Sequence, residues 1–136
     1  MDGTRIDHVG IATNSLDDYT QFWTALGFNQ GTDELNEEQG VKIRFFESPH
    51  DSARIELLEP LESDTPIGRF IAKKGIGVQQ VAVRVDDIYT TISLLKNIGV
   101  DMINDEPVVG AGGHKIAFVH PRSTGGVLVE LLSTAD

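Results

Sequence analysis

The feature that most constrains this sequence is an internal duplication. Four blocks of the first half recur in the same order in the second half, at offsets that grow from 72 to 74: residues 7–12 with 79–84, 26–28 with 98–100, 42–45 with 115–118 and 55–58 with 129–132. Short loop insertions between the blocks account for the growing offset. The chain is therefore expected to contain two copies of one structural unit.

Each copy begins with a strand pattern that leads into a helix pattern. Residues 5–12 and 77–85 are rich in apolar and β-branched side chains, which is typical of strands. A capping residue then precedes each expected helix and a glycine stands at its expected end: Ser15 and Gly27 in the first copy, Asp86 or Asp87 and Gly99 in the second. Apolar spacing predicts one packed face on each helix, formed by Leu16, Tyr19, Trp23 and Leu26, and by Ile88, Ile92, Leu95 and Ile98.

Three further strands are expected in each copy, near 28–34, 41–47 and 53–58, and near 101–104, 115–119 and 126–132. Between the copies, Thr65 can cap a short linker helix over 65–74, with Pro66 in its first turn. The pattern predicts a single α+β domain over 1–136, with one module at about 5–60 and a second at about 77–133.

Composition narrows the range of sites and partners. The 136 residues suit one domain, and the absence of cysteine means that any metal must be held by nitrogen and oxygen ligands. A formal net charge of -10 argues against a broad surface for nucleic acid or an anionic membrane. Residues 1–5 are polar and lead directly into a strand pattern, so we expect neither a signal peptide nor a membrane span, and a cytoplasmic location.

Polar residues interrupt the apolar strands at duplicated positions. His8 and Gln80 form one equivalent pair, and Glu56 and Glu130 form the other. Taken singly, each is more often a packing residue or a solvent-facing edge residue, and a carboxylate buried without a partner is costly. Taken together, two neutral and two anionic side chains related by the repeat can neutralise a divalent cation. The duplication thus predicts one metal site with these four ligands.

The sequence also resembles a known family over essentially its whole length. The segments that carry the resemblance are residues 6–12, 38–42, 55–61, 83–88, 105–107, 110–113 and above all 117–130. They resemble the vicinal oxygen chelate superfamily, and within it the methylmalonyl-CoA epimerases. The resemblance implies two βαβββ modules paired into a curved mixed sheet around a central metal site, and it suggests a homodimer.

The resemblance further implies a reaction. His8, Glu56, Gln80 and Glu130 match the family's metal positions, and the activity would be interconversion of (R)- and (S)-methylmalonyl-CoA by 1,1-proton transfer through a metal-stabilised enolate. Epimerisation requires a base on each face of the reacting carbon. Our hypothesis is that Glu130 serves one face and Glu56 the other; a role for Glu56 as a ligand alone stays open.

Two positions depart from the family pattern. Gln79-Gln80 replaces the usual His-His, which exchanges an imidazole ligand for an amide oxygen and favours harder ions such as Mn²⁺, Co²⁺ or Mg²⁺. Ile43 stands where some relatives carry a catalytic glutamate, which leaves the second base uncertain.

Two other functions on the same scaffold compete with the epimerase. One is a glyoxalase I-type lyase acting on a thiol-derived hemithioacetal, and the other is a non-catalytic binding protein of the bleomycin-resistance kind. Lys73, Lys74 and Arg122 could meet the phosphates of coenzyme A, although surface charge is the simpler interpretation.

Overall fold

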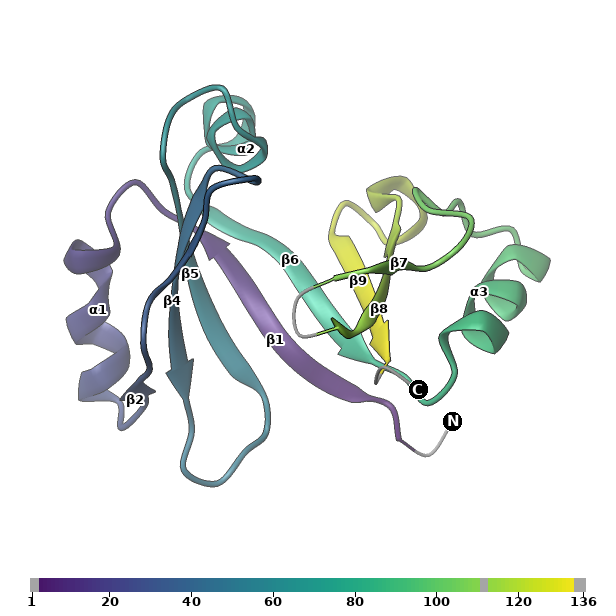
Figure 1. Ribbon diagram of the computed structural model, residues 1–136, viewed down its shortest axis with the longest axis horizontal. Coiled ribbons are helices and arrows are strands. Elements are labelled where there is room, and N and C mark those ends of the chain that lie inside the picture. Colours follow the sequence, from purple (N-terminus) through teal and green to yellow (C-terminus); the bar gives the residue numbers. More distant parts are fainter. Residues whose placement is uncertain (1–2, 111–112, 134–136) are drawn as a thin grey trace. The chain divides into compact units, whose positions relative to one another are not determined.

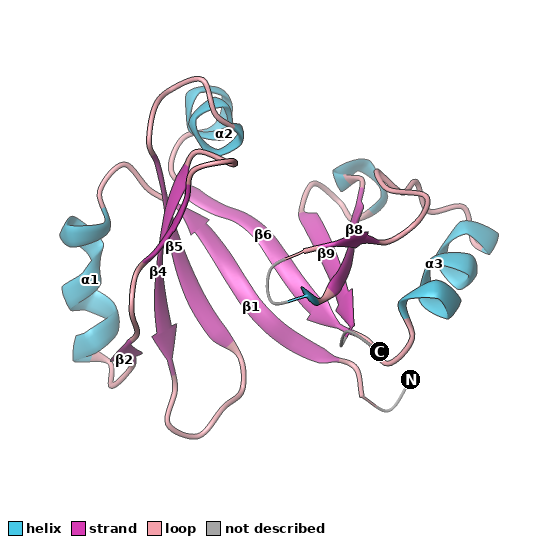
Figure 2. Ribbon diagram, in the orientation of Figure 1, coloured by secondary structure: helices cyan, strands magenta, loops and turns pink. Residues whose placement is uncertain are grey.

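The computed structural model describes residues 3–110 and 113–133 and divides into two compact units. The N-terminal unit comprises His8–Gln79, and the C-terminal unit comprises the described residues of Met1–Asp7 and Gln80–Asp136. The chain passes between them inside two strands, β1 (Arg5–Ala12) and β6 (Gly77–Arg84). Figure 1 follows the elements along the chain, and Figure 2 distinguishes helices from strands.

The N-terminal unit contains a mixed sheet in the order β2-β4-β5-β1. Its strands are β2 (Asn29–Gln30), β3 (Glu34–Asn36), β4 (Val41–Glu47) and β5 (Arg54–Pro60) beside β1. Strand β5 pairs parallel with β1 and antiparallel with β4, while β2 and β3 both pair antiparallel with β4. The central strand β5 therefore has neighbours on both sides.

Two helices cover opposite faces of this sheet. Helix α1 (Leu16–Ala25) packs through Leu16 and Trp23 in a cluster with Leu57, whereas α2 (Pro66–Lys74) packs through Ile67 in a cluster with Leu58. Consecutive strand residues point to opposite faces. Side chains at even positions of β5 therefore point away from α1.

The C-terminal unit repeats this arrangement in the order β6-β9-β8-β7. Helix α3 (Ile88–Asn97) follows β6, and the remaining strands are β7 (Val108–Val109), β8 (Lys115–Val119) and β9 (Leu128–Ser133). Strand β9 pairs parallel with β6 and antiparallel with β8, as β5 does with β1 and β4. The repeated α+β organisation predicted by the duplication is confirmed.

Local signals for helix ends are also confirmed. The Ser15 hydroxyl accepts from the Asp18 amide, the Asp87 carboxylate accepts from the Tyr89 and Thr90 amides, and Thr65 caps α2 with Pro66 in its first turn. Gly27 and Gly99 follow α1 and α3 with φ of 110° and 89°. These are left-handed values that favour glycine.

The weakest strand predictions are wrong in detail. The strand expected at 28–34 splits into β2 and β3 around Gly31, whose amide donates to the Phe45 carbonyl. The strand expected at 101–104 is reduced to one bridge between Met102 and Val119, because the side chain of Asn104 accepts from the Phe118 amide in place of a backbone carbonyl. Strand β7 was not predicted.

The predicted apolar helix faces hold only in part. Leu26 is 61% exposed and Ile98 is 70% exposed, since both residues lie at the C-caps beyond the last helical turn. Tyr19 is also exposed, whereas Leu16, Ile88 and Ile92 are buried. The expected loop at 110–113 includes residues 111 and 112, which lie outside the described residues.

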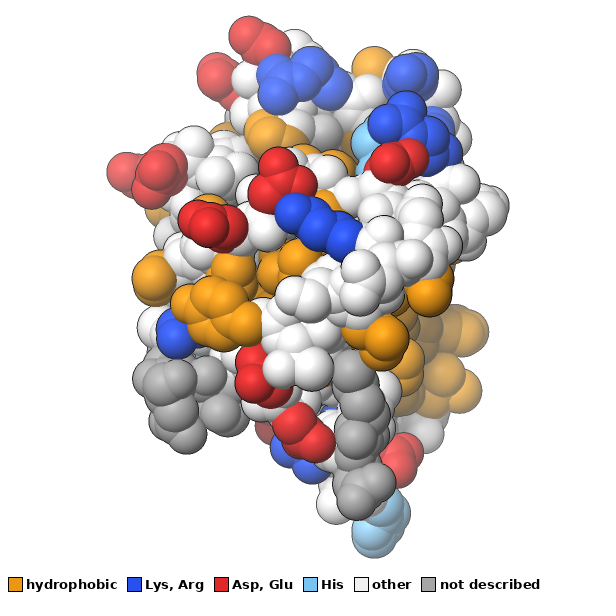
Figure 3. All heavy atoms as spheres, turned by 90° about the vertical axis from the view of Figure 1, so that its right-hand side faces the viewer, with side chains coloured by type: hydrophobic (Ala, Val, Ile, Leu, Met, Phe, Trp, Pro, Cys, Tyr) orange, Lys and Arg blue, Asp and Glu red, His pale blue; other side chains and the backbone are white. Residues whose placement is uncertain are grey.

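Surface charge is mixed on the face seen in Figure 3. Basic side chains lie in small groups beside acidic ones, with apolar side chains between them. Within residues 3–110 and 113–133, no helix is long and apolar enough to cross a membrane.

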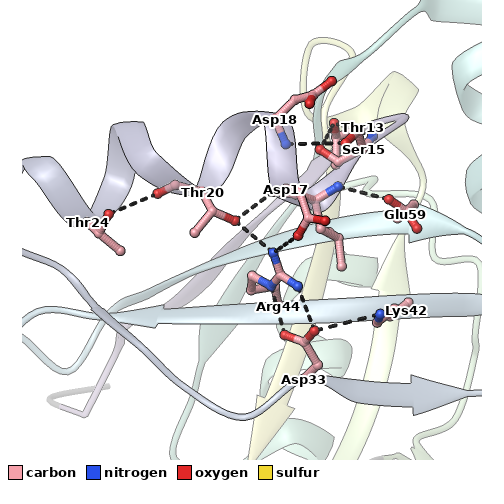
Figure 4. Close-up of polar contacts among 11 residues, drawn as sticks. Thr13, Ser15, Asp17, Asp18, Thr20, Thr24, Asp33, Lys42, Arg44 and Glu59 are labelled. Carbon is pink, nitrogen blue, oxygen red and sulfur yellow. Dashed lines mark hydrogen bonds and ion pairs between the residues drawn. The ribbon is translucent and has the colours of Figure 1, made fainter.

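One buried arginine ties three segments of the N-terminal unit together (Figure 4). Arg44 on β4 donates from Nε and Nη2 to both carboxylate oxygens of Asp33, at 2.9 and 2.8 Å. Its Nη1 donates to Asp17 and Thr20 of α1, at 2.8 and 2.9 Å. The hydrogen bond from Arg44 lowers the pKa of Asp33, and the two carboxylates raise the pKa of Arg44. Helix α1 and the segment before β3 are thereby held against β4.

We therefore predict that Arg44→Met lowers the free energy of unfolding by roughly 2–4 kcal/mol, because it leaves Asp33 without its fork of donors. Urea denaturation measures the change. The matched control is Arg69→Met, which removes a surface ion pair with Asp64 and should change stability by less than about 0.5 kcal/mol. Equal effects of the two substitutions would contradict the structural role of Arg44.

Candidate functional site

Two of the four predicted ligands meet in the N-terminal unit. His8 on β1 and Glu56 on β5 are 7% and 6% exposed, and His8 Nδ1 lies 3.3 Å from Glu56 Oε2. Both side chains point away from α1, because Ile11 and Leu57, at odd positions of the same two strands, pack in the α1 cluster while His8 and Glu56 are at even positions. The structure thus brings an imidazole and a carboxylate together on the face that α2 also occupies.

The other two predicted ligands meet in the C-terminal unit. Gln80 Nε2 on β6 donates to Glu130 Oε1 on β9 at 3.1 Å, and both side chains are half-buried. Glu130 lies between Val129 and Leu131, which both pack in the α3 cluster, so its carboxylate points to the opposite face.

The two pairs occupy equivalent places in their sheets. Gly10 is the register partner of Glu56, and Ala82 is the register partner of Glu130. A very small residue, Gly10 or Ala82, therefore lies directly beside each glutamate. The polar partner of the glutamate, His8 or Gln80, lies two residues before that small residue on β1 or β6. We call His8 with Glu56, and Gln80 with Glu130, the two half-sites.

Glu130 is held in an unusual electrostatic environment. Its pKa is raised to about 7, first by burial and then by the nearby negative charge of Asp7, while the hydrogen bond from Gln80 opposes the shift. Asp7 itself accepts from Arg84 Nη2 at 2.7 Å. A carboxyl group with a pKa near neutrality can both take and return a proton.

A third residue, Arg54, joins the N-terminal half-site. Arg54 Nη2 lies 3.3 Å from Glu56 Oε2, and the guanidinium carbon lies 5.4 Å from the centre of the Phe45 ring. Sequence reasoning missed this arginine. The available signal was its position two residues before Glu56 on the same strand, which places both side chains on one face.

Position 43 has a packing role in this chain. Ile43 packs in the cluster formed by Ala12, Leu58 and Ile67 beneath α2. The carboxylate that some relatives carry at this point is therefore replaced by apolar contact.

The donor atoms of both half-sites suit a divalent cation. Neighbouring ligand atoms on an octahedral ion are about 3 Å apart, given metal–oxygen distances of about 2.1 Å, and the two half-sites have spacings of 3.3 and 3.1 Å. An amide, an imidazole and two carboxylates favour hard or borderline ions. Rotation of its amide by half a turn lets Gln80 present oxygen instead of nitrogen.

The four ligands divide between the two units, two in each. Within the described ranges, no group of three or more His, Asp or Glu side chains is arranged to hold a metal. Their convergence on a single ion therefore stays a prediction.

The N-terminal unit also contains an apolar cavity of about 260 Å³. Ile11, Trp23 and Leu57 line it, so it lies on the α1 side of the sheet. The His8–Glu56 half-site faces the other side, and the cavity is separate from it.

Comparison with known proteins supports the fold and the family. Residues 7–118 match the model of the Glyoxalase/Bleomycin resistance protein/Dioxygenase superfamily. The uncharacterized protein YqjC of Bacillus subtilis is 41% identical, covering 93% of this chain and 90% of that protein. The mitochondrial methylmalonyl-CoA epimerase of Bos taurus is 36% identical, covering 93% and 73%.

Solved structures agree with these relatives. A methylmalonyl-CoA epimerase in complex with methylmalonyl-CoA and NH₄⁺ superposes with a TM-score of 0.81 at 38% identity, covering 97% of this chain and 95% of that one. The expected family resemblance is confirmed by sequence similarity and by similarity of structure. The chain belongs to the Glyoxalase/Bleomycin resistance protein/Dioxygenase superfamily.

Proposed function

We propose that this protein is a metal-dependent epimerase that interconverts (R)- and (S)-methylmalonyl-CoA. The observation that carries the proposal is the pair of equivalent half-sites, each with a glutamate between two apolar residues of its strand. The similarity to methylmalonyl-CoA epimerases, one of them bound to methylmalonyl-CoA, supports this reaction over the lyase alternative.

The reaction removes and returns the proton on the carbon between the thioester and the carboxylate. His8, Glu56, Gln80 and Glu130 would hold a divalent cation, with Mn²⁺, Co²⁺ or Mg²⁺ favoured. Such a cation, when bound, would polarise the thioester carbonyl and make the neighbouring C–H more acidic. Glu130 would serve as the base on one face of the carbon, because its carboxylate belongs to one half-site and can take and return a proton there.

Glu56 is the candidate for the opposite face. It is buried and contacts both His8 and Arg54, so its carboxylate is positioned by two cationic or hydrogen-bonding partners. With Ile43 packed among apolar residues, Glu56 is the acid that the N-terminal half-site offers.

We further propose, from the family resemblance, a cytoplasmic homodimer.

The first test follows solvent deuterium entering the α-position of methylmalonyl-CoA. Metal-stripped protein should lose exchange, and reconstitution with Mn²⁺, Co²⁺ or Mg²⁺ should restore it, because the C–H is too weakly acidic for a carboxylate alone. Mass spectrometry measures the incorporation. Absence of exchange under both conditions would refute the epimerase, and a parallel hemithioacetal assay would then test the lyase.

The raised pKa of Glu130 predicts a pH-dependent stability of the metal-free protein. The unfolded chain releases this proton near the ordinary value of 4.5 and the folded chain near 7, so the folded state holds more protons between these values. The contribution of Glu130 to the free energy of unfolding therefore falls as the pH rises from about 4.5 to 7, and the metal-free protein becomes less stable.

Glu130→Gln should flatten this pH dependence, as measured by urea denaturation across the same range in the presence of a chelator. The exposed Glu62→Gln variant is the control and should keep the slope of the unmodified protein. An unchanged slope in Glu130→Gln would mean that Glu130 titrates normally.

Glu56→Gln tests the second base. Epimerisation should fall by about 100-fold or more, the usual loss of a general base, while deuterium exchange continues for the epimer whose proton faces Glu130. Bound metal is measured in the variant, since loss of the metal with equal loss of exchange for both epimers would indicate a ligand role alone. Unchanged turnover in both directions would exclude Glu56 from the chemistry.

A further inference from the structure

The N-terminal half-site contains a cation, Arg54, that contacts Glu56 and is also accessible to a ligand. Arg54 begins β5 and is the register partner of His8 on β1, so the two residues are neighbours on adjacent parallel strands. Glu56 lies two residues further along β5 and points to the same face. The guanidinium of Arg54 therefore contacts one predicted ligand, Glu56, and its backbone position is next to the other, His8.

The environment of Arg54 differs from that of the structural arginine of the same unit. The side chain of Arg44 is 10% exposed and its guanidinium donates to two carboxylates and a hydroxyl. The side chain of Arg54 is 34% exposed, whereas that of its partner Glu56 is 8% exposed. Arg54 thus lies at the accessible edge of a buried half-site, where a ligand can reach it.

The aromatic ring of Phe45 packs against the guanidinium of Arg54. Phe45 is the register partner of Glu56 on β4, and the guanidinium carbon lies 5.4 Å from the centre of its ring. Contact with an aromatic face stabilises a cation and excludes water from one side of it. A partly dehydrated, positioned guanidinium is well suited to bind a carboxylate through two parallel hydrogen bonds.

The repeat shows that this cation belongs to one half of the molecule. The residue of the C-terminal unit that corresponds to Arg54 is Leu128, which is the register partner of Gln80 just as Arg54 is that of His8. The ligand positions are duplicated, but at the position of Arg54 the second copy has the apolar Leu128. Arg54 therefore distinguishes the two half-sites chemically.

The substrate of the proposed function has a matching asymmetry. Its reacting carbon carries a thioester on one side and a free carboxylate on the other. We propose that Arg54 binds this free carboxylate and thereby selects 2-carboxyacyl thioesters over simple acyl thioesters. This inference rests on the proposed function and adds the residue that determines specificity and orients the substrate.

The test compares two CoA thioesters on the metal-reconstituted protein. Initial rates of deuterium exchange against methylmalonyl-CoA concentration give kcat and KM, and competition by propionyl-CoA, which lacks the free carboxylate, gives an inhibition constant. Arg54→Met should raise KM for methylmalonyl-CoA by about 10- to 100-fold, the range for a lost charge-assisted hydrogen bond. The inhibition constant for propionyl-CoA should change by less than about twofold, because that ligand has no partner for Arg54.

Two further variants make the result specific. Arg54→Lys keeps the charge without the planar fork and should give a smaller rise in KM, and it replaces the Met variant as the test if that variant does not fold. Arg69→Met, which removes an exposed arginine of the same unit, should leave both constants unchanged. Bound metal is measured in every variant, so that a loss of activity caused by displacement of Glu56 and loss of the metal is recognised.

The outcomes separate this inference from the function on which it rests. Absence of exchange in the unmodified protein overturns the epimerase itself. Normal exchange in the unmodified protein, with Arg54→Met weakening both thioesters equally or neither of them, overturns only the role of Arg54.

Discussion

The burial of two glutamates inside apolar strands is the constraint on which the site depends. A carboxylate taken out of water is unfavourable unless charge or hydrogen bonds compensate for the lost hydration. Glu56 is compensated by His8 and Arg54, whereas Glu130 has Gln80 as a neutral donor and Asp7 as a repulsive neighbour. The pKa of Glu130 is raised to about 7, first by burial and then by the charge of Asp7. The same scaffold thus places one acid in each unit and gives the two acids different surroundings.

In the N-terminal unit, the residues that hold α1 and the residues of the half-site lie on opposite faces of the sheet. On β4, Arg44 points toward α1 and ties it to Asp33, while the neighbouring Phe45 points to the other face and contacts Arg54. Because consecutive residues point to opposite faces, the two arginine networks lie on opposite faces of the sheet. Substitutions on the face of the half-site, such as Ile43, can therefore occur while the packing of α1 is kept.

Much of the fold could be predicted from the sequence because its signals are local and occur twice. Caps at Ser15 and Asp87 and glycines at Gly27 and Gly99 each act within a few residues, and the repeat supplied an independent check. The strand at 101–104 was predicted wrongly because an Asn104 side chain competes for the amide of Phe118, a contact between residues 14 apart. Arg54 was missed for a related reason, since its importance follows from pairing with His8 across 46 residues of chain.

The pairing of His8 with Glu56 and of Gln80 with Glu130 could be predicted from the repeat, but the ligand that the pairs bind could not. A duplicated sequence predicts that His8 matches Gln80 and Glu56 matches Glu130, and the structure shows that each strand pair brings its two side chains within 3.3 Å. Duplication alone would give two half-sites with the same chemistry. The substitutions of Gln for His and of Arg for Leu between the halves break that equivalence, and an asymmetric substrate requires such a difference. Under the proposed function, Arg54 in one half-site is the group that distinguishes the free carboxylate of the substrate from its thioester, and its counterpart Leu128 lacks that capacity.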